Sequence, residues 1–132
     1  MSYDAFLVVM SQLAGHRKAR VVINGDVIFF EASEKKNQWT LYTKVFTGEG
    51  FLPRSVRSCV SSGGILRWQG EGAYLKLDVS SHCVYLIQEI QMQEGKYIPF
   101  RHYLSDFLNI AEEWKEILQD ISEGDCSSIQ VS

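Results

Sequence analysis

The first stretch of the chain places apolar residues with the period of a helix. They recur at steps of three and four positions, at Tyr3, Phe6, Leu7, Met10, Leu13 and Ala14. This spacing puts them on one helical face. Ser2 suits the N-cap position, and Gly15 suits a left-handed stop. The pattern predicts a helix from about Tyr3 to Ala14.

The period then changes to that of strands. Arg20–Ile23 and Val27–Phe30 are rich in β-branched and aromatic residues, and Asn24-Gly25-Asp26 separates them. Asn-Gly tolerates the positive φ angles of a tight hairpin turn. A polar loop follows, and then a third strand from Trp39 to about Phe46. The three strands are expected to form an antiparallel meander.

A short helix, two strands and a long helix complete the pattern. Pro53 suits the first turn of a helix within Leu52–Val60. Alternation predicts strands at Ala73–Val79 and from Cys83 to about Met92. The last helix runs from about Pro99 to Ile121. Its expected buried stripe consists of Leu104, Phe107, Leu108, Ala111, Trp114, Leu118 and Ile121.

The predicted fold is α+β, with the order α-β-β-β-α-β-β-α and a twisted antiparallel sheet flanked by helices. At 132 residues the chain fits one domain. We expect this domain to span residues 1–122, and residues 123–132, where the pattern is lost, to form a flexible tail.

Composition excludes several kinds of partner. The net charge of −3 argues against sequence-independent nucleic-acid binding and against docking on anionic lipid. The sequence shows no secretory signal and no apolar run of about 20 residues. Cys59, Cys83 and Cys126 are widely spaced, as free thiols of a reducing compartment are. A cytoplasmic location is expected.

Motifs for catalysis or metal binding are missing from the sequence. Neither Gly48-Glu49-Gly50 nor Gly70-Glu71-Gly72 follows a strand and opens a helix, as a phosphate-binding loop does. His82 and Cys83 are adjacent and lack a second pair with ligand spacing. We therefore predict no catalytic residue, no cofactor and no metal site.

The sheet region carries more large apolar residues than one buried face needs. They are Ile28, Phe29, Phe30, Trp39, Leu41, Tyr42 and Phe46. A half-solvated antiparallel sheet normally has one clearly polar face. Either the chain's own helices cover both faces, or one face is an exposed patch for a partner. The pattern leaves both interpretations open.

Three stretches resemble the class I type III secretion chaperones: the opening helix Phe6-Leu-Val-Val-Met-Ser-Gln-Leu13, the strands Gly72–Asp78 and Cys83–Gln88, and the closing Leu104–Trp114. The resemblance spans about Asp4 to Gly124. It implies a dimeric protein without enzymatic activity that holds an extended segment of a secreted client protein.

The expected client-binding residues are the aromatics of the first three strands, with two valines of the first helix. They are Val8, Val9, Phe29, Phe30, Trp39 and Tyr42. In the family the middle helix and the fourth strand form most of the dimer contact. The matching residues here are Val56, Val60, Trp68, Leu75 and Leu77.

The middle helix is short and also carries Arg54, Ser55, Arg57 and Ser58. That polar content makes a poor self-complementary face, so the second subunit is either another copy or a different class I chaperone. Two other functions stay open: a regulator that binds transcription machinery, and a small-ligand sensor with the aromatics lining a pocket. No direct nucleic-acid or membrane partner is expected.

Overall fold

The computed structural model describes residues 2–33, 38–61, 73–91 and 97–131, with side chains placed up to residue 124. The elements follow the predicted order. They are α1 (Tyr3–His16), β1 (Lys18–Ile23), β2 (Asp26–Ala32), β3 (Gln38–Thr47), α2 (Arg54–Ser61), β4 (Ala73–Asp78), β5 (Cys83–Gln91) and α3 (Tyr97–Val131).

The five strands form one antiparallel sheet in the order β1-β2-β3-β5-β4, so the predicted meander of the first three strands is confirmed. Asn24 and Gly25 have φ angles of 51° and 86°. Positive φ at both central residues is the requirement of a tight hairpin turn that matches strand twist. The hairpin therefore follows from local chemistry alone.

Helix α1 differs from its predicted limits and face. Ser2 caps it as predicted, because its side chain accepts a hydrogen bond from the Ala5 N–H. The left-handed stop is Arg17, with φ 61°, rather than Gly15. The buried residues are Phe6, Val9 and Leu13, whereas Tyr3 and Leu7 are exposed. Two overlapping apolar stripes share Phe6 and Leu13, and only packing against the sheet selects between them.

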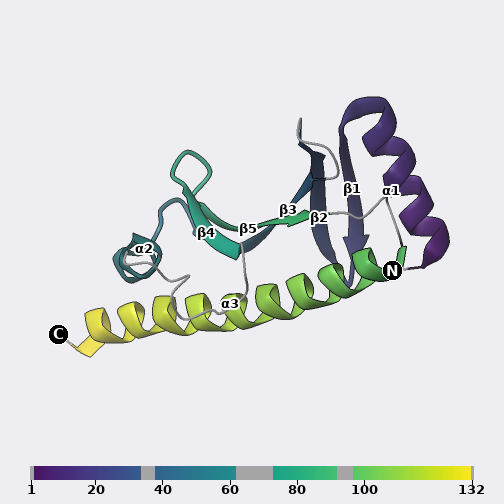
Figure 1. Cartoon of the computed structure of the whole chain (residues 1–132). Helices are drawn as coiled ribbons and strands as arrows, with labels where there is room; N and C mark the ends of the chain where they lie inside the picture. The colour runs from purple at the N-terminus through teal and green to yellow at the C-terminus, as the bar shows by residue number, and fades with distance from the viewer. Residues whose placement is uncertain (1, 34–37, 62–72, 92–96, 132) are drawn as a thin grey trace.

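Helices α1 and α3 both cover one face of the sheet, and α2 packs against α3 and β4 (Figure 1). Phe100 of α3 joins these layers, since its ring lies 5.0 Å from Phe6, 5.7 Å from Phe30 and 5.5 Å from Trp39. Trp114 is fully buried, as predicted. This single core sets the inner face of the sheet.

Helix α3 extends to Val131, ten residues beyond the predicted end at Ile121. The expected tail at residues 123–132 is therefore helical up to Val131. An existing helix gains a backbone hydrogen bond with each added residue, so it continues after its apolar stripe has ended. Flexibility of this segment stays a prediction. Among the described helices, none is long and apolar enough to cross a membrane.

Candidate functional site: the open face of the sheet

The outer face of the sheet carries a row of mostly apolar side chains that crosses all five strands. Strand register aligns the row, residue opposite residue, as Arg20, Phe29, Tyr42, Ile87 and Tyr74. Inner-face neighbours such as Phe30 and Leu41 are fully buried, whereas Tyr74 is exposed. No helix of the described chain packs over this row. We call this surface the open face.

Aromatic contacts fix the centre of the open face. The rings of Phe29 and Tyr42 stack with centroids 4.9 Å apart, and Tyr85 meets Tyr42 edge-on at 6.3 Å. The Tyr42 hydroxyl donates a hydrogen bond to the Glu31 carboxylate at 3.2 Å. Burial raises the pKa of Tyr42, and the charge and hydrogen bond of Glu31 raise it further. The phenol therefore stays neutral near pH 7 with its ring held in place.

A groove of about 540 Å³ lies along the open face over β3, β5 and β4. Its apolar lining includes Tyr42, Tyr74, Val79, Tyr85 and Ile87. Tyrosine offers a large apolar ring with a polar tip, which suits a contact surface that is wet when empty. The groove thus has the chemistry of a binding surface for side chains.

The acidic groups of the open face already have partners. Glu31 accepts from Tyr42 and lies 3.8 Å from the Lys18 ammonium. Glu89 accepts a hydrogen bond from the Gln38 amide at 3.1 Å. The Ser80 hydroxyl donates to Asp78 at 2.7 Å, and this bond, with others from Ser80 and Ser81, lowers the pKa of Asp78.

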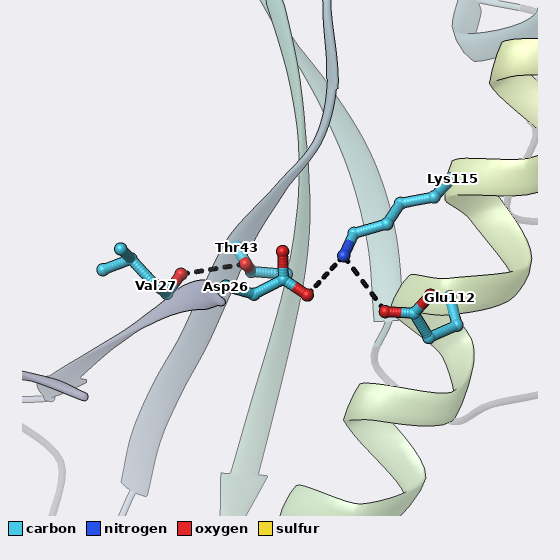
Figure 2. A network of polar contacts seen from close by, with 5 residues as sticks. All are labelled: Asp26, Val27, Thr43, Glu112 and Lys115. Carbon is cyan, nitrogen blue, oxygen red and sulfur yellow. Dashed lines mark hydrogen bonds and ion pairs between the residues drawn. The ribbon is translucent and has the colours of Figure 1, made fainter. Parts of the chain in front are cut away.

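A second hollow, of about 820 Å³, lies where the sheet divides. Strands β2 and β3 pair only through Phe29–Ala32 and Trp39–Tyr42. Beyond that ladder, the Thr43 hydroxyl donates to the Val27 carbonyl at 2.9 Å (Figure 2).

Across the same hollow, Lys115 of α3 donates hydrogen bonds to the Asp26 and Glu112 carboxylates (Figure 2). Lys115 thereby ties the β1–β2 hairpin to α3. Burial alone lowers the pKa of Lys115, but the hydrogen bonds and charges of the two acids outweigh it and raise the pKa.

The predicted client-binding residues divide into three groups. Val9, Phe30 and Trp39 belong to the core, with exposed fractions of 1%, 0% and 7%, so their placement on a binding surface was wrong. Phe29 and Tyr42 do come together, on the open face. Val8 is exposed on α1 and belongs to no part of the open-face row.

Phe30 was misplaced because adjacent residues of a strand point to opposite faces of the sheet. Both Phe29 and Phe30 are apolar, so the sequence does not show which of them faces the core. Three open-face residues were missed by the sequence reading: Tyr74, Tyr85 and Ile87. Their signal is the alternation of aromatic or aliphatic with charged residues in β4 and β5.

The predicted dimer contact is partly corrected. Val56 is fully buried inside this chain and cannot touch a second subunit, so its assignment was wrong. Val56 lies at the centre of the one apolar face of a short helix, and this face packs against the core of its own chain. Val60, Leu75 and Leu77 are half-buried on the contacting elements α2 and β4 and stay predictions. Trp68 lies outside the described residues.

Within the described residues, no group of three or more His, Cys, Asp or Glu side chains is arranged to hold a metal ion. Cys59 and Cys83 are free thiols. The Cys83 thiol is buried and donates to the Ser81 carbonyl at 3.1 Å. These thiols occupy structural positions on α2 and β5.

Comparison with solved structures places the fold. A chain of the ExsC–ExsE complex matches with a TM-score of 0.64 at 13% identity, over 89% of this chain and 96% of that one. A chain of the HopA1–SchA chaperone–effector complex matches with a TM-score of 0.58 at 16% identity, over 86% and 89%. The chain has a class I secretion-chaperone fold.

A chain of the ExoT–SpcS complex from Pseudomonas aeruginosa shares the secretion-chaperone fold, with a TM-score of 0.50 at 12% identity, over 86% and 98%. No protein-family model and no curated protein matches the sequence significantly. The fold predicted from the resemblance is therefore confirmed by shape, at identities where sequence comparison alone detects no relative.

Proposed function

We propose that the protein is a non-enzymatic secretion chaperone that binds an extended segment of a secreted client protein on the open face of its sheet. The observation that carries the proposal is the row from Phe29 through Tyr42 and Ile87 to Tyr74, which no described helix covers. Support comes from the fold, which is shared with a chain of a chaperone–effector complex.

An extended segment suits this surface for two physical reasons. Side chains of an extended chain point alternately to its two sides, so every second residue can enter the groove between Tyr42 and Tyr74. Strands β1 and β4 are the outermost strands of the sheet. The free edge of β1 can add main-chain hydrogen bonds to a client strand. No nucleotide takes part in this binding, and release falls to the apparatus that receives the client.

Co-purification tests the proposal. The protein is tagged in its native host, and proteins retained with it are identified by mass spectrometry. Ile87→Thr with Tyr74→Thr removes two apolar contacts and places threonine, a residue that suits strands, at both positions. Each interface anchor contributes about 1–2 kcal/mol, so retention of the client is expected to fall at least about tenfold.

Phe51→Ser is the matched control for that experiment. It removes a large exposed apolar side chain from the connection between β3 and α2, outside the open-face row. Client retention by this control is expected to equal that of the unaltered protein. Equal losses in both variants, or unchanged retention in the double variant, contradict binding on the open face.

We also propose that α2 and β4 contact a second subunit, either another copy or a different chaperone. Leu75 and Leu77 on the outermost strand keep part of their apolar surface accessible. An accessible strand edge with such residues is normally covered by a partner. Light scattering on the purified protein, alone and with candidate chaperones, tests this. A soluble monomer that ignores all of them contradicts it.

A further inference from the structure

We propose that the segment bound on the open face is acidic and that its carboxylates pair with Arg20, Lys44 and Lys76. This inference rests on the proposed function, because it specifies the chemistry of the client at the same surface. Three features of the molecule support it: the positions of these cations in the sheet, their lack of acidic partners, and the negative charge of α3.

Strand register places the cations beside the rings of the open face. Lys44 and Lys76 both lie opposite Tyr85, one on each side of it. Arg20 lies opposite Phe29. Neighbouring strands are about 4.8 Å apart, so the two lysines start roughly 10 Å from each other across Tyr85. An apolar side chain seated on the central ring would therefore have a cation on either side.

None of the three cations has an acidic partner among the described residues. The acids of the same face, Glu31, Glu89 and Asp78, accept hydrogen bonds from neutral donors and lie outside the row through Tyr85. Lys18 differs, because it pairs with Glu31. The row that Lys44, Tyr85 and Lys76 form across β3, β5 and β4 thus carries two cations and no acid.

The surface of α3 has the opposite charge. The solvent-facing side of α3 carries Asp106, Glu112, Glu113, Glu116, Asp120 and Glu123. The cations in the same stretch are Arg101 and Lys115, and Lys115 is already bound to two acids. The whole chain has a net charge of −3. An acidic segment would be repelled from α3 and attracted to the lysines that flank Tyr85.

An extended acidic segment matches this arrangement in length. Residues two apart on the same side of an extended chain are about 6.6 Å apart, and three residues span about 10 Å. Carboxylates two or three positions from an apolar residue therefore reach the cations that flank Tyr85. A nucleic-acid strand would need a denser array of cations than these three residues provide.

Designed peptides test the inference on the full-length protein. The probe is a fluorescein-labelled twelve-residue peptide with two leucines and four aspartates in a serine background. Its counterparts carry four lysines or four asparagines instead, and an oligothymidine of twenty nucleotides represents nucleic acid. Fluorescence anisotropy at 50 and 200 mM NaCl is expected to show at least tenfold tighter binding of the aspartate peptide than of the lysine peptide at low salt. The preference is expected to shrink at high salt.

Two double variants that change the net charge equally distinguish binding at the open face from a general effect of the protein's charge. Lys44→Gln with Lys76→Gln is expected to abolish the preference for the aspartate peptide. Arg17→Gln with Arg101→Gln removes exposed cations from the end of α1 and from α3 and is expected to keep it. Equal binding of the three peptides, equal losses in both variants, or tighter binding of the oligothymidine overturns the inference.

Failure of the inference is distinguishable from failure of the proposed function. If the peptides show no charge preference while Ile87→Thr with Tyr74→Thr still loses the native client, the open face binds clients by apolar contact alone. The acidic assignment is then overturned and the proposed function stands. If that variant also retains the client, both are overturned.

Discussion

Phe29 and Tyr42 stack across β2 and β3 with their ring planes 12° apart, and they form the last pair of the ladder before these strands separate. The stack therefore joins the β1–β2 hairpin to the rest of the sheet at the centre of the open face. Beyond it, the two parts are held by the Thr43–Val27 hydrogen bond and by Lys115. Phe29 and Tyr42 thus belong both to the proposed binding surface and to the contacts that hold the hairpin to the rest of the sheet.

Tyr42→Phe keeps the stack and removes the hydrogen bond to Glu31. Loss of one such bond is expected to lower the free energy of unfolding by about 0.5–1.5 kcal/mol at pH 7. Urea melts measure this, with Tyr103→Phe on α3 as a control that should change stability by less than about 0.5 kcal/mol.

The same variant makes a pH prediction. The pKa of Tyr42 is raised in the folded state, so the neutral phenol stabilises the fold below its unfolded pKa of about 10. This contribution is lost as the pH rises through the folded pKa. Stability of the unaltered protein is therefore expected to fall more steeply between pH 9 and pH 11 than that of Tyr42→Phe. Parallel curves in that range contradict the account.

The Lys115–Asp26 contact is expected to couple the hairpin to α3. Both side chains are partly buried, with exposed fractions of 26% and 29%. Lys115→Met is expected to cost about 1–2 kcal/mol, between the values for exposed and for fully buried pairs. A double-mutant cycle with Asp26→Asn should give a coupling energy near 1 kcal/mol. A coupling energy of zero would show that the ion pair does not stabilise the contact between the hairpin and α3.

Phe29 and Phe30 are expected to differ sharply, although they are neighbours of the same type. Phe30→Ala empties a fully buried site in the core and is expected to cost about 3–5 kcal/mol. Phe29→Ala removes a half-buried ring on the open face and is expected to cost clearly less. Denaturant melts compare the two directly. A larger loss for Phe29→Ala would mean that the faces of β2 are assigned the wrong way round.

These outcomes show which parts of the molecule the sequence could specify. The Asn24-Gly25 turn, the Ser2 cap and the buried Trp114 were predictable, because each depends on local chemistry or on one clear stripe. Which of Phe29 and Phe30 faces the core was not predictable, since both residues are apolar and only packing against Phe100 selects Phe30. For this reason only Phe29 and Tyr42, of the six residues predicted to bind a client, lie on the open face.

The face of α1 was ambiguous in the same way, and Val9 rather than Leu7 is buried because the sheet contacts that side. The aromatic row could not be assembled from sequence. It requires the register of five strands, and the order β3-β5-β4 brings Tyr42, Ile87 and Tyr74 together from distant segments.

The most direct test of client binding on the open face is site-specific photo-crosslinking in the native host. Tyr74 on the open face and Tyr103 on α3 are equally exposed, at 38% and 37%, and form a matched pair. Each is replaced in turn by p-benzoylphenylalanine, and crosslinked proteins are identified by mass spectrometry. The account predicts a crosslink to a client from position 74 and none from position 103. Crosslinks from position 103 alone, or from both positions equally, would contradict it.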